Sequence, residues 1–278
     1  EVPPRMQGQP KVHKKDYPFR PIVSSRDSIT APISKYITRI LTPLTINSTY
    51  QVKDSIHLKN ELLKHTIPDT HILVSFDITN MYPSIPRTPA IQAIRELLTA
   101  DPTLHQRTPL TVDHIITLLE AILDLAHFRW LGDFYAQISG CAMGDGTSSP
   151  ISNAFMTKYE KNALTTYRNL HDDPTAVSTI SIIQFWFRQA DDTLTSIHRD
   201  HADRFFDYIN TIHPSIKWTS EREVNGKISM LDLTILRQPD GTFHFDVYRK
   251  PTHTDQYIPW DSDQPIQHKA ATIHSLTR

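Results

Sequence analysis

Residues 183–193 read IQFWFRQADDT, and this stretch decides the fold class of the chain. Apolar side chains dominate residues 180–187, Asp191 and Asp192 follow, and a second run begins at once with residues 193–197. This pattern is typical of two antiparallel strands joined by a turn. Adjacent carboxylates beside a buried hairpin repel each other and resist the loss of water. A bound divalent cation would remove that penalty.

A third aspartate follows a similar apolar run. Residues 73–82 read LVSFDITNMY, so Asp77 comes at the end of a stretch that is typical of a buried strand. Mg²⁺ prefers oxygen ligands and usually takes a few carboxylates together with substrate phosphates. Two such ions can drive in-line displacement at phosphorus. Asp77, Asp191 and Asp192 therefore predict the two-magnesium site of a nucleic-acid polymerase palm; an acidic surface turn is the alternative.

Composition sets the outer limits on the kind of protein. Of the 278 residues, 38% are hydrophobic and 21% are charged, and no apolar run reaches the roughly 18 residues of a membrane helix. The single cysteine, Cys141, excludes internal disulfides and multi-cysteine zinc sites. The chain opens with Glu-Val-Pro-Pro rather than Met, so we expect it to be part of a longer protein.

The distribution of charge is more informative than the net charge of −1, which alone argues against a nucleic-acid binder. Residues 5–39 contain eight Lys or Arg but only two acidic residues. A basic segment on a neutral chain predicts one face that meets phosphates, with a solvated surface arm as the alternative.

Periodicity predicts the remaining elements. Helical spacing marks residues 33–44, 55–65, 88–98, 111–123, 149–170 and 200–213. Predicted strands cover residues 71–76, 178–187, 193–197, 216–224, 228–236 and 243–248, with turns at Asn225-Gly226 and residues 239–241. Residues 1–26 are expected to form extended segments and turns. This order predicts an α+β fold with helices on one face of a mainly antiparallel sheet.

Six segments together resemble the reverse transcriptases of Penelope-like retroelements over nearly the whole chain. Residues 9–14 with 20–25 (QPKVHK and RPIVSS) are similar to the fingers segment of that family, and residues 76–86 to its first catalytic block. Residues 137–153 resemble its Gln, Gly, Met-Gly, Ser and Asn block, residues 190–193 its catalytic hairpin, and residues 217–232 the block after it. The most family-specific stretch is VYRKPTHTD, residues 247–255.

The resemblance implies a right-hand polymerase fold with fingers, a palm built on a ferredoxin-like antiparallel sheet, and little thumb. The expected boundaries are fingers at 1–68, palm at 69–87, helices of the fingers at 88–135, palm at 136–258, and a connection towards a thumb at 259–278. Without a thumb, such a piece is expected to hold primer and template weakly.

The resemblance also implies roles for individual residues. Asp77 and Asp191 would bind two Mg²⁺ ions, or Mn²⁺ in their place, with Asp192 close by. Arg20 is the candidate triphosphate clamp, because guanidinium binds phosphate bidentately. Tyr82 would be the steric gate that excludes a ribose 2′-hydroxyl. The predicted nucleotide-binding set is Lys11, Lys14, Arg20, Tyr82, Gln137 and Gly144, and the predicted primer grip is Tyr248, Arg249, Lys250 and His253.

The function implied by the resemblance is an RNA-directed DNA polymerase that takes an RNA template, a DNA primer and deoxynucleoside triphosphates in the nucleus. Two alternatives stay open. In residues 145–149, DGTSS replaces the usual Ser-Pro-Leu-Ser-Pro of the family and adds the carboxylate of Asp145, while Gln189 and Ala190 replace the usual aromatic residue and Val. These departures support a binding module that has lost catalysis, whereas the intact Asp77, Asp191 and Asp192 favour an enzyme. An RNA-dependent RNA polymerase is the other alternative, against which Tyr82 argues.

Overall fold

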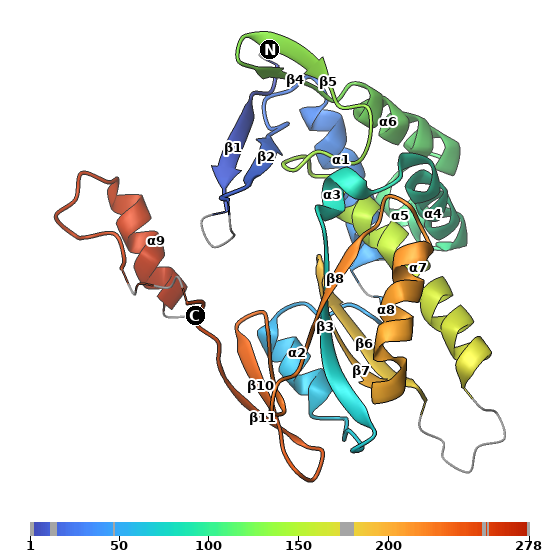
Figure 1. Ribbon diagram of the computed structural model, residues 1–278. Helices are drawn as coiled ribbons and strands as arrows, with labels where there is room; N and C mark the ends of the chain where they lie inside the picture. The colour runs from blue at the N-terminus through green and yellow to red at the C-terminus, as the bar shows by residue number, and fades with distance from the viewer. Residues whose placement is uncertain are drawn as a thin grey trace. The chain divides into compact units, whose positions relative to one another are not determined.

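The computed structural model describes residues 3–11, 16–46, 48–172, 181–251, 254 and 256–276 (Figure 1). Two compact units are present, Glu1–Val247 and Tyr248–Arg278. Within the described residues, no helix combines the length and the apolar character needed to cross a membrane. The elements of the first unit are β1 (Met6–Pro10), β2 (Phe19–Val23), α1 (Ala31–Thr45), α2 (Ser55–Leu62), β3 (His71–Ile78), α3 (Met81–Ser84), α4 (Arg87–Ala100), α5 (Leu104–Arg107), α6 (Val112–Asp124), β4 (His127–Trp130), β5 (Asp133–Ala136), α7 (Ser148–His171), β6 (Ile183–Gln189), β7 (Asp192–His198), the 3-10 turn η1 (Arg199–His201), α8 (Ala202–Thr211), β8 (Trp218–Arg222), β9 (Lys227–Met230), β10 (Leu233–Arg237) and β11 (Phe243–Val247).

A four-stranded antiparallel sheet in the order β6-β7-β3-β8 forms the centre of the first unit. β3 lies between β7 and β8, and its last residues pair with the beginnings of both partners. The first four residues of β3 are all buried, while residues 75–78 alternate between partly buried and buried. The sheet is therefore covered on both faces at one end of β3 and on a single face at the other end.

Alternate residues along β3 belong to two different hydrophobic cores. Ile72, Val74, Phe76 and Ile78 join the larger core, which contains buried residues of α1, α4, α6, α7 and α8. Leu73 belongs to the smaller core, together with residues of α2 and of the three-stranded sheet β11-β10-β9. In Figure 1, α7 and α8 accordingly lie on one side of the central sheet and α2 lies on the other.

Two small hairpins complete the first unit. β1 pairs with β2, and β4 pairs with β5. The end of β2 is tied to the loop before α7, because the Val23 N–H donates to the Met143 carbonyl at 2.8 Å and the Ser25 N–H donates to the Gly144 carbonyl at 3.3 Å. The basic segment thus reaches the Met-Gly block directly.

The second unit is small. Its one regular element is α9 (Ile266–Leu276), which follows a stretch of turns. The Lys269 ammonium donates to the carbonyls of Trp260 and Ser262, at 2.7 and 2.5 Å, and thereby fastens this stretch to the helix.

The predicted α+β class is confirmed, with four corrections to its details. Helices cover one face of the central sheet as expected, but α2 packs on the other face, since Leu73, Phe185 and Phe187 make that face apolar as well. The predicted strand 228–236 is two strands, because Leu231 adopts a positive φ of 55° and turns the chain back. The region 88–135 is not wholly helical, since β4 and β5 form a hairpin there. Asp192 is the first residue of β7, so only Asp191 of the pair lies in the turn.

Candidate active site

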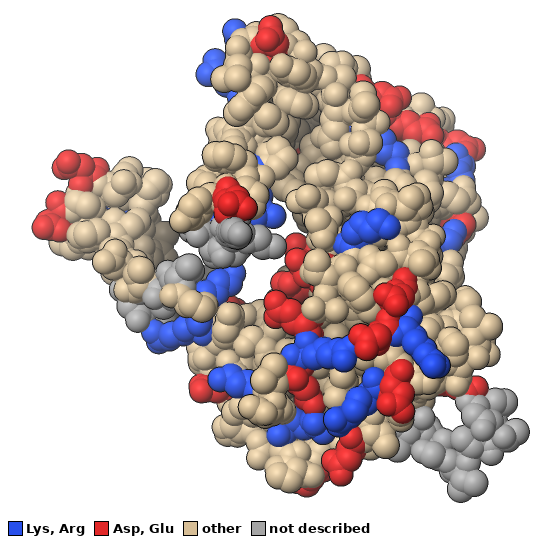
Figure 2. Space-filling model, viewed as in Figure 1, with Lys and Arg blue, Asp and Glu red and all other residues tan. Residues whose placement is uncertain are grey.

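The three predicted metal ligands lie together at the open end of the central sheet. Asp77 on β3 is directly opposite Asp192 on β7. The carbonyl of Asp191 accepts a hydrogen bond of 3.2 Å from the N–H of Ile78, which fixes the turn against the end of β3. Acidic side chains gather beside the tip of the β6–β7 hairpin in the space-filling view (Figure 2). Asp77 and the distant pair Asp191-Asp192 thus meet through strand register.

The face of the sheet explains why these carboxylates can reach solvent. Residues directly opposite each other in an antiparallel pair point to the same face, so Asp77 and Asp192 share one. Leu73 lies on the same face. There α2 and β9–β11 cover the sheet around Leu73, but this cover ends before Asp77. Asp77 is half-buried, and Asp191 and Asp192 are exposed. Like charges directly opposite each other destabilise a sheet, and a divalent cation between them would offset this repulsion.

The donor set fits a metal that is shared between protein and substrate. Within the described ranges, no group of three or more His, Cys, Asp or Glu side chains is placed to hold a metal ion. Zinc and calcium sites built from protein alone need such a group. Mg²⁺ does not, because it is usually bound by one or two carboxylates plus the phosphates of a substrate. The register pair of Asp77 and Asp192, with Asp191 adjacent, fits that requirement.

Tyr82 stands immediately next to the carboxylates. β3 ends at Ile78, Asn80 takes a positive φ of 51°, and the short helix α3 then carries Tyr82. Burial raises the pKa of the Tyr82 hydroxyl, and the Asp191 carboxylate raises it further. The phenol therefore stays neutral at physiological pH and keeps its O–H as a hydrogen-bond donor.

A cavity of about 340 Å³ lies beside the β6–β7 hairpin. This volume is within the range of small-molecule sites, roughly 300–1,000 Å³. Tyr82 lines the cavity together with residues of the hairpin, of α7 and of the segment before α2: Ile46, Gln51, Val52, Lys53, Ser149, Asn153, Arg188, Gln189 and Ala190. The predicted steric gate therefore faces a space of the right size for part of a nucleotide.

The loop between β5 and α7 brings the Met-Gly block against two other segments. The N–H of Cys141 donates to the Tyr82 carbonyl at 2.8 Å, and Gly140 packs on Pro83. Gly144 has a φ of +119°, and a Cβ atom there would lie 2.6 Å from the Val23 carbonyl oxygen. The protein's own backbone thus accounts for the glycine at position 144, and the nucleotide-binding role of this residue stays a prediction.

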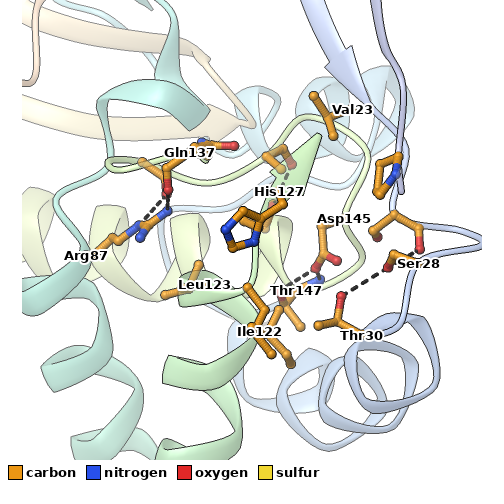
Figure 3. Close-up of a pocket in the computed structure, with 17 residues that line it drawn as sticks. Val23, Ser28, Thr30, Arg87, Ile122, Leu123, His127, Gln137, Asp145 and Thr147 are labelled. Atoms are coloured by element: carbon orange, nitrogen blue, oxygen red, sulfur yellow. Dashed lines mark hydrogen bonds between the residues drawn. The ribbon is translucent and has the colours of Figure 1, made fainter. Parts of the chain in front are cut away.

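The extra carboxylate of Asp145 is used inside the protein. One carboxylate oxygen accepts from the Ser34 hydroxyl at 3.0 Å, and the other accepts from the N–H and the hydroxyl of Thr147 at 2.8 and 2.5 Å. Figure 3 shows Asp145 beside Thr147 on the wall of a small cavity. Its volume of about 30 Å³ leaves room for about two water molecules, so this cavity is too small for a nucleotide.

The remaining predicted nucleotide-binding residues are spread over the fingers side of the unit. Gln137 lines the small cavity of Figure 3, where its carbonyl accepts from the Arg87 guanidinium at 2.5 Å. Arg20 is exposed on β2, and the Lys11 N–H closes the β1–β2 hairpin by donating to the Pro18 carbonyl at 2.8 Å. Lys14 lies outside the described residues. The phosphate-binding roles of these side chains stay predictions.

The predicted primer grip belongs to the other unit. Tyr248, Arg249 and Lys250 open the segment Tyr248–Arg278. Arg249 and Lys250 are exposed there, and His253 is not among the described residues. Their role in holding a primer stays a prediction.

Sequence reasoning missed the residues that support the hairpin from behind. Arg188 on β6 is fully buried and pairs with Glu160 on α7, which is also fully buried. Asn153 on α7 contacts the same guanidinium at 3.2 Å. The available signal was an arginine inside an apolar strand, because a buried cation there requires a buried partner.

This chain is similar to known proteins in structure rather than in sequence. Neither a protein-family model nor a curated protein sequence matches this chain. It is similar to the apo telomerase of Candida tropicalis truncated from its C-terminal domain, with a TM-score of 0.61 and 13% identity over 88% of this chain and 55% of that chain. The telomerase of Candida albicans in complex with a TWJ fragment of telomeric RNA gives a TM-score of 0.61 and 13% identity over 88% and 46%. The BmCPV RNA-dependent RNA polymerase at the elongation state gives 0.56 and 14% over 87% and 22%.

These likenesses establish the fold. The chain has the right-hand polymerase fold, as the sequence predicted, and this fold is shared by telomerase and by viral RNA polymerases. The chain spans about half of the truncated telomerase (55%) and about a fifth of the viral enzyme (22%).

Proposed function

We propose that this protein is an RNA-directed DNA polymerase of the Penelope-like kind, which extends a primer 3′-hydroxyl on an RNA template. One observation carries the proposal: in a chain with a polymerase fold, strand register puts Asp77 opposite Asp192, with Asp191 next to it, at the uncovered end of the sheet face that carries Leu73. The stretch VYRKPTHTD at residues 247–255 supports the narrower family assignment.

In this proposal Asp77 and Asp191 hold the metal ions, and Asp192 adds negative charge beside them. Bound Mg²⁺ would supply the charge that activates the primer hydroxyl and neutralises the triphosphate and the leaving pyrophosphate. The protein's own contribution is position, because the β3–β7 register and the hydrogen bond from Ile78 to Asp191 set the spacing of the carboxylates before any substrate arrives.

Tyr82 would select the sugar. The phenol lines the 340 Å³ cavity beside Ala190, and in this proposal its aromatic ring would clash with the 2′-hydroxyl of a bound ribonucleotide. This location supports DNA synthesis over RNA synthesis on a fold that serves both. Replacing Tyr82 by Ala is expected to raise the incorporation of ribonucleotides relative to deoxynucleotides.

A binding module without catalysis is the second candidate, because residues 145–149 depart from the family pattern. The internal hydrogen bonds of Asp145 argue against it, since this carboxylate is occupied by Ser34 and Thr147 rather than directed at a substrate.

Primer extension on an RNA template tests the proposal. The assay uses saturating primer–template, a large excess of enzyme and Mg²⁺, because the chain is expected to hold nucleic acid weakly. Extension by the wild type is expected to fall at least about 10³-fold in Asp77→Asn and Asp191→Asn, since each removes a charged metal ligand. Asp113→Asn is the matched control, because Asp113 is an exposed residue on α6 that pairs with Arg95; its rate should stay within about twofold. A wild-type protein that binds RNA but extends no primer would favour the binding module.

A further inference from the structure

A fully buried ion pair lies directly behind the catalytic turn. Arg188 precedes Asp191 by three residues on β6, and its side chain and that of Glu160 are both 0% exposed. The Nε of Arg188 donates to Oε2 of Glu160 at 2.9 Å and lies 2.8 Å from Oε1, which accepts from the Trp186 indole N–H at 3.0 Å. Burial raises the pKa of Glu160, and the Arg188 guanidinium and the indole N–H oppose that change.

The same guanidinium also holds the backbone of the turn. Its Nη1 donates to the Ala190 carbonyl at 3.1 Å and to the Asn153 side-chain oxygen at 3.2 Å. Ala190 has a φ of +54°, a left-handed conformation that residues with a Cβ atom adopt reluctantly. The carbonyl that Arg188 holds belongs to the peptide linking Ala190 to Asp191. Fixing that peptide plane limits the directions in which the Asp191 side chain can point.

The main chain of Arg188 is held as firmly as its side chain. Its N–H donates to the Tyr50 carbonyl at 2.7 Å, and its carbonyl accepts from the Val52 N–H at 2.9 Å. Its Nη2 is buried without a hydrogen-bond partner among the described residues. An unsatisfied buried donor costs free energy, so the position of this guanidinium is not the one that best satisfies its own hydrogen bonds. It is a position from which the guanidinium contacts both Glu160 and the Ala190 carbonyl.

Stability alone does not explain a charged pair at this position. A buried ion pair is often no more stabilising than apolar residues of the same volume, so its best physical justification is the geometry that it imposes. Here the geometry imposed is that of a turn whose next residue is Asp191.

We infer that Arg188 is a positioning residue: clamped by Glu160, it fixes the Ala190–Asp191 peptide so that the Asp191 carboxylate is directed towards Asp77. This inference rests on the proposed function for the role of Asp191. Arg188 acts through the turn and touches neither substrate nor metal.

The test compares the fully buried Arg188 with Arg237, a partly buried arginine that makes a similar ion pair. Arg188→Lys keeps the charge but cannot reach both Glu160 and the Ala190 carbonyl. Arg237→Lys is the matched control, since Arg237 at the end of β10 contacts both carboxylate oxygens of Glu223, at 2.6 and 3.2 Å, and their side chains are 16% and 4% exposed. Glu160→Gln is the second variant at the site; it keeps the shape of the side chain if Arg188→Lys does not fold.

Three quantities are measured on each variant: the thermal unfolding midpoint, Mn²⁺ binding by electron paramagnetic resonance without substrate, and the Mg²⁺ concentration that gives half the maximal extension rate. Arg188→Lys and Glu160→Gln are expected to weaken Mn²⁺ binding about tenfold and to raise the Mg²⁺ requirement by a similar factor. Arg237→Lys should leave both within twofold while lowering the unfolding midpoint to a comparable extent.

Two results overturn the inference. One is wild-type Mn²⁺ binding in a folded Arg188→Lys or Glu160→Gln protein. The other is equal weakening by Arg237→Lys, which would reduce the effect to lost stability. Failure of the proposed function looks different: the wild type would extend no primer, whereas Mn²⁺ binding would still separate the Arg188 and Arg237 variants.

Discussion

A single methyl group added at Gly140 should lower both the stability and the activity of the protein without replacing a polar residue of the site. Its φ of +67° is left-handed, and a Cβ atom there would lie 2.6 Å from the Cα of Pro83 and closer still to the Pro83 carbonyl. These are backbone atoms, so no side-chain rotation can relieve the overlap. Pro83 directly follows Tyr82, so any displacement is passed to the predicted gate.

The expected magnitude follows from the two parts of this strain. Left-handed backbone costs an alanine about 1–2 kcal/mol. Restoring an ordinary carbon–carbon contact requires a backbone shift of about 1 Å, and overpacking of this kind costs a further 1–3 kcal/mol, roughly. Gly140→Ala should therefore lower the free energy of unfolding by about 2–5 kcal/mol. A misplacement of about 1 Å near the chemistry should slow primer extension about 10²-fold.

Gly132→Ala separates the cost of the left-handed backbone from the cost of the steric overlap. Gly132 lies in the β4–β5 turn with a φ of +102°, and an added Cβ would meet no described atom within 4 Å. This variant carries the backbone strain without the overlap, so it should lose only about 1–2 kcal/mol and keep its extension rate. Urea unfolding and primer extension on both variants provide the measurement. Equal losses of stability, or a Gly140→Ala protein with the wild-type rate, would refute the steric reasoning.

Two further predictions concern the loop before α7 and the other end of β3. Asp145→Ala removes the acceptor of three hydrogen bonds and should lower the free energy of unfolding by about 1–3 kcal/mol in urea, with a smaller loss for Asp145→Asn; equal losses would mean that the hydrogen bonds do not matter. Burial lowers the pKa of His71 below its ordinary 6.5. In acid, the unfolded chain therefore binds more protons at this residue than the folded chain does. The stability that His71 contributes above about pH 6.5 is lost as the pH falls through the lowered pKa. Unfolding free energies at several pH values between 8 and 5 should fall less steeply for His71→Gln than for the wild type, and parallel curves would contradict this assignment.

The elements that carry Asp77, Asp191 and Asp192 were predictable because their signal is local. One apolar run leads to Asp77 and another precedes Asp191-Asp192, and the structure has strands at each. The division of residues 228–236 was not predictable in the same way. Met230, Leu231 and Leu233 are apolar, and nothing in their residue types indicates that Leu231 adopts a positive φ of 55°.

The support behind the site was out of reach for a different reason. Arg188 and Glu160 are 28 positions apart in the sequence, and only the packing of β6 on α7 brings them into contact. The apolar strand around Arg188 indicates that the arginine is buried, but no local pattern identifies Glu160 as its partner. Likewise, the Val23 carbonyl explains the glycine at position 144, and no local pattern connects this residue of β2 to Gly144.

Residues 145–149, where the sequence departs from the pattern that it otherwise resembles, are packed into the fold. Asp145 is tied to Ser34 near the beginning of α1 and to Thr147 within the loop. Gly146 lies against the same helix, where a Cβ atom would be 2.9 Å from the Thr38 hydroxyl. The loop is thus matched to α1 in both polar contacts and volume. The loop that contacts Tyr82 through Cys141 is therefore a packed part of the fold.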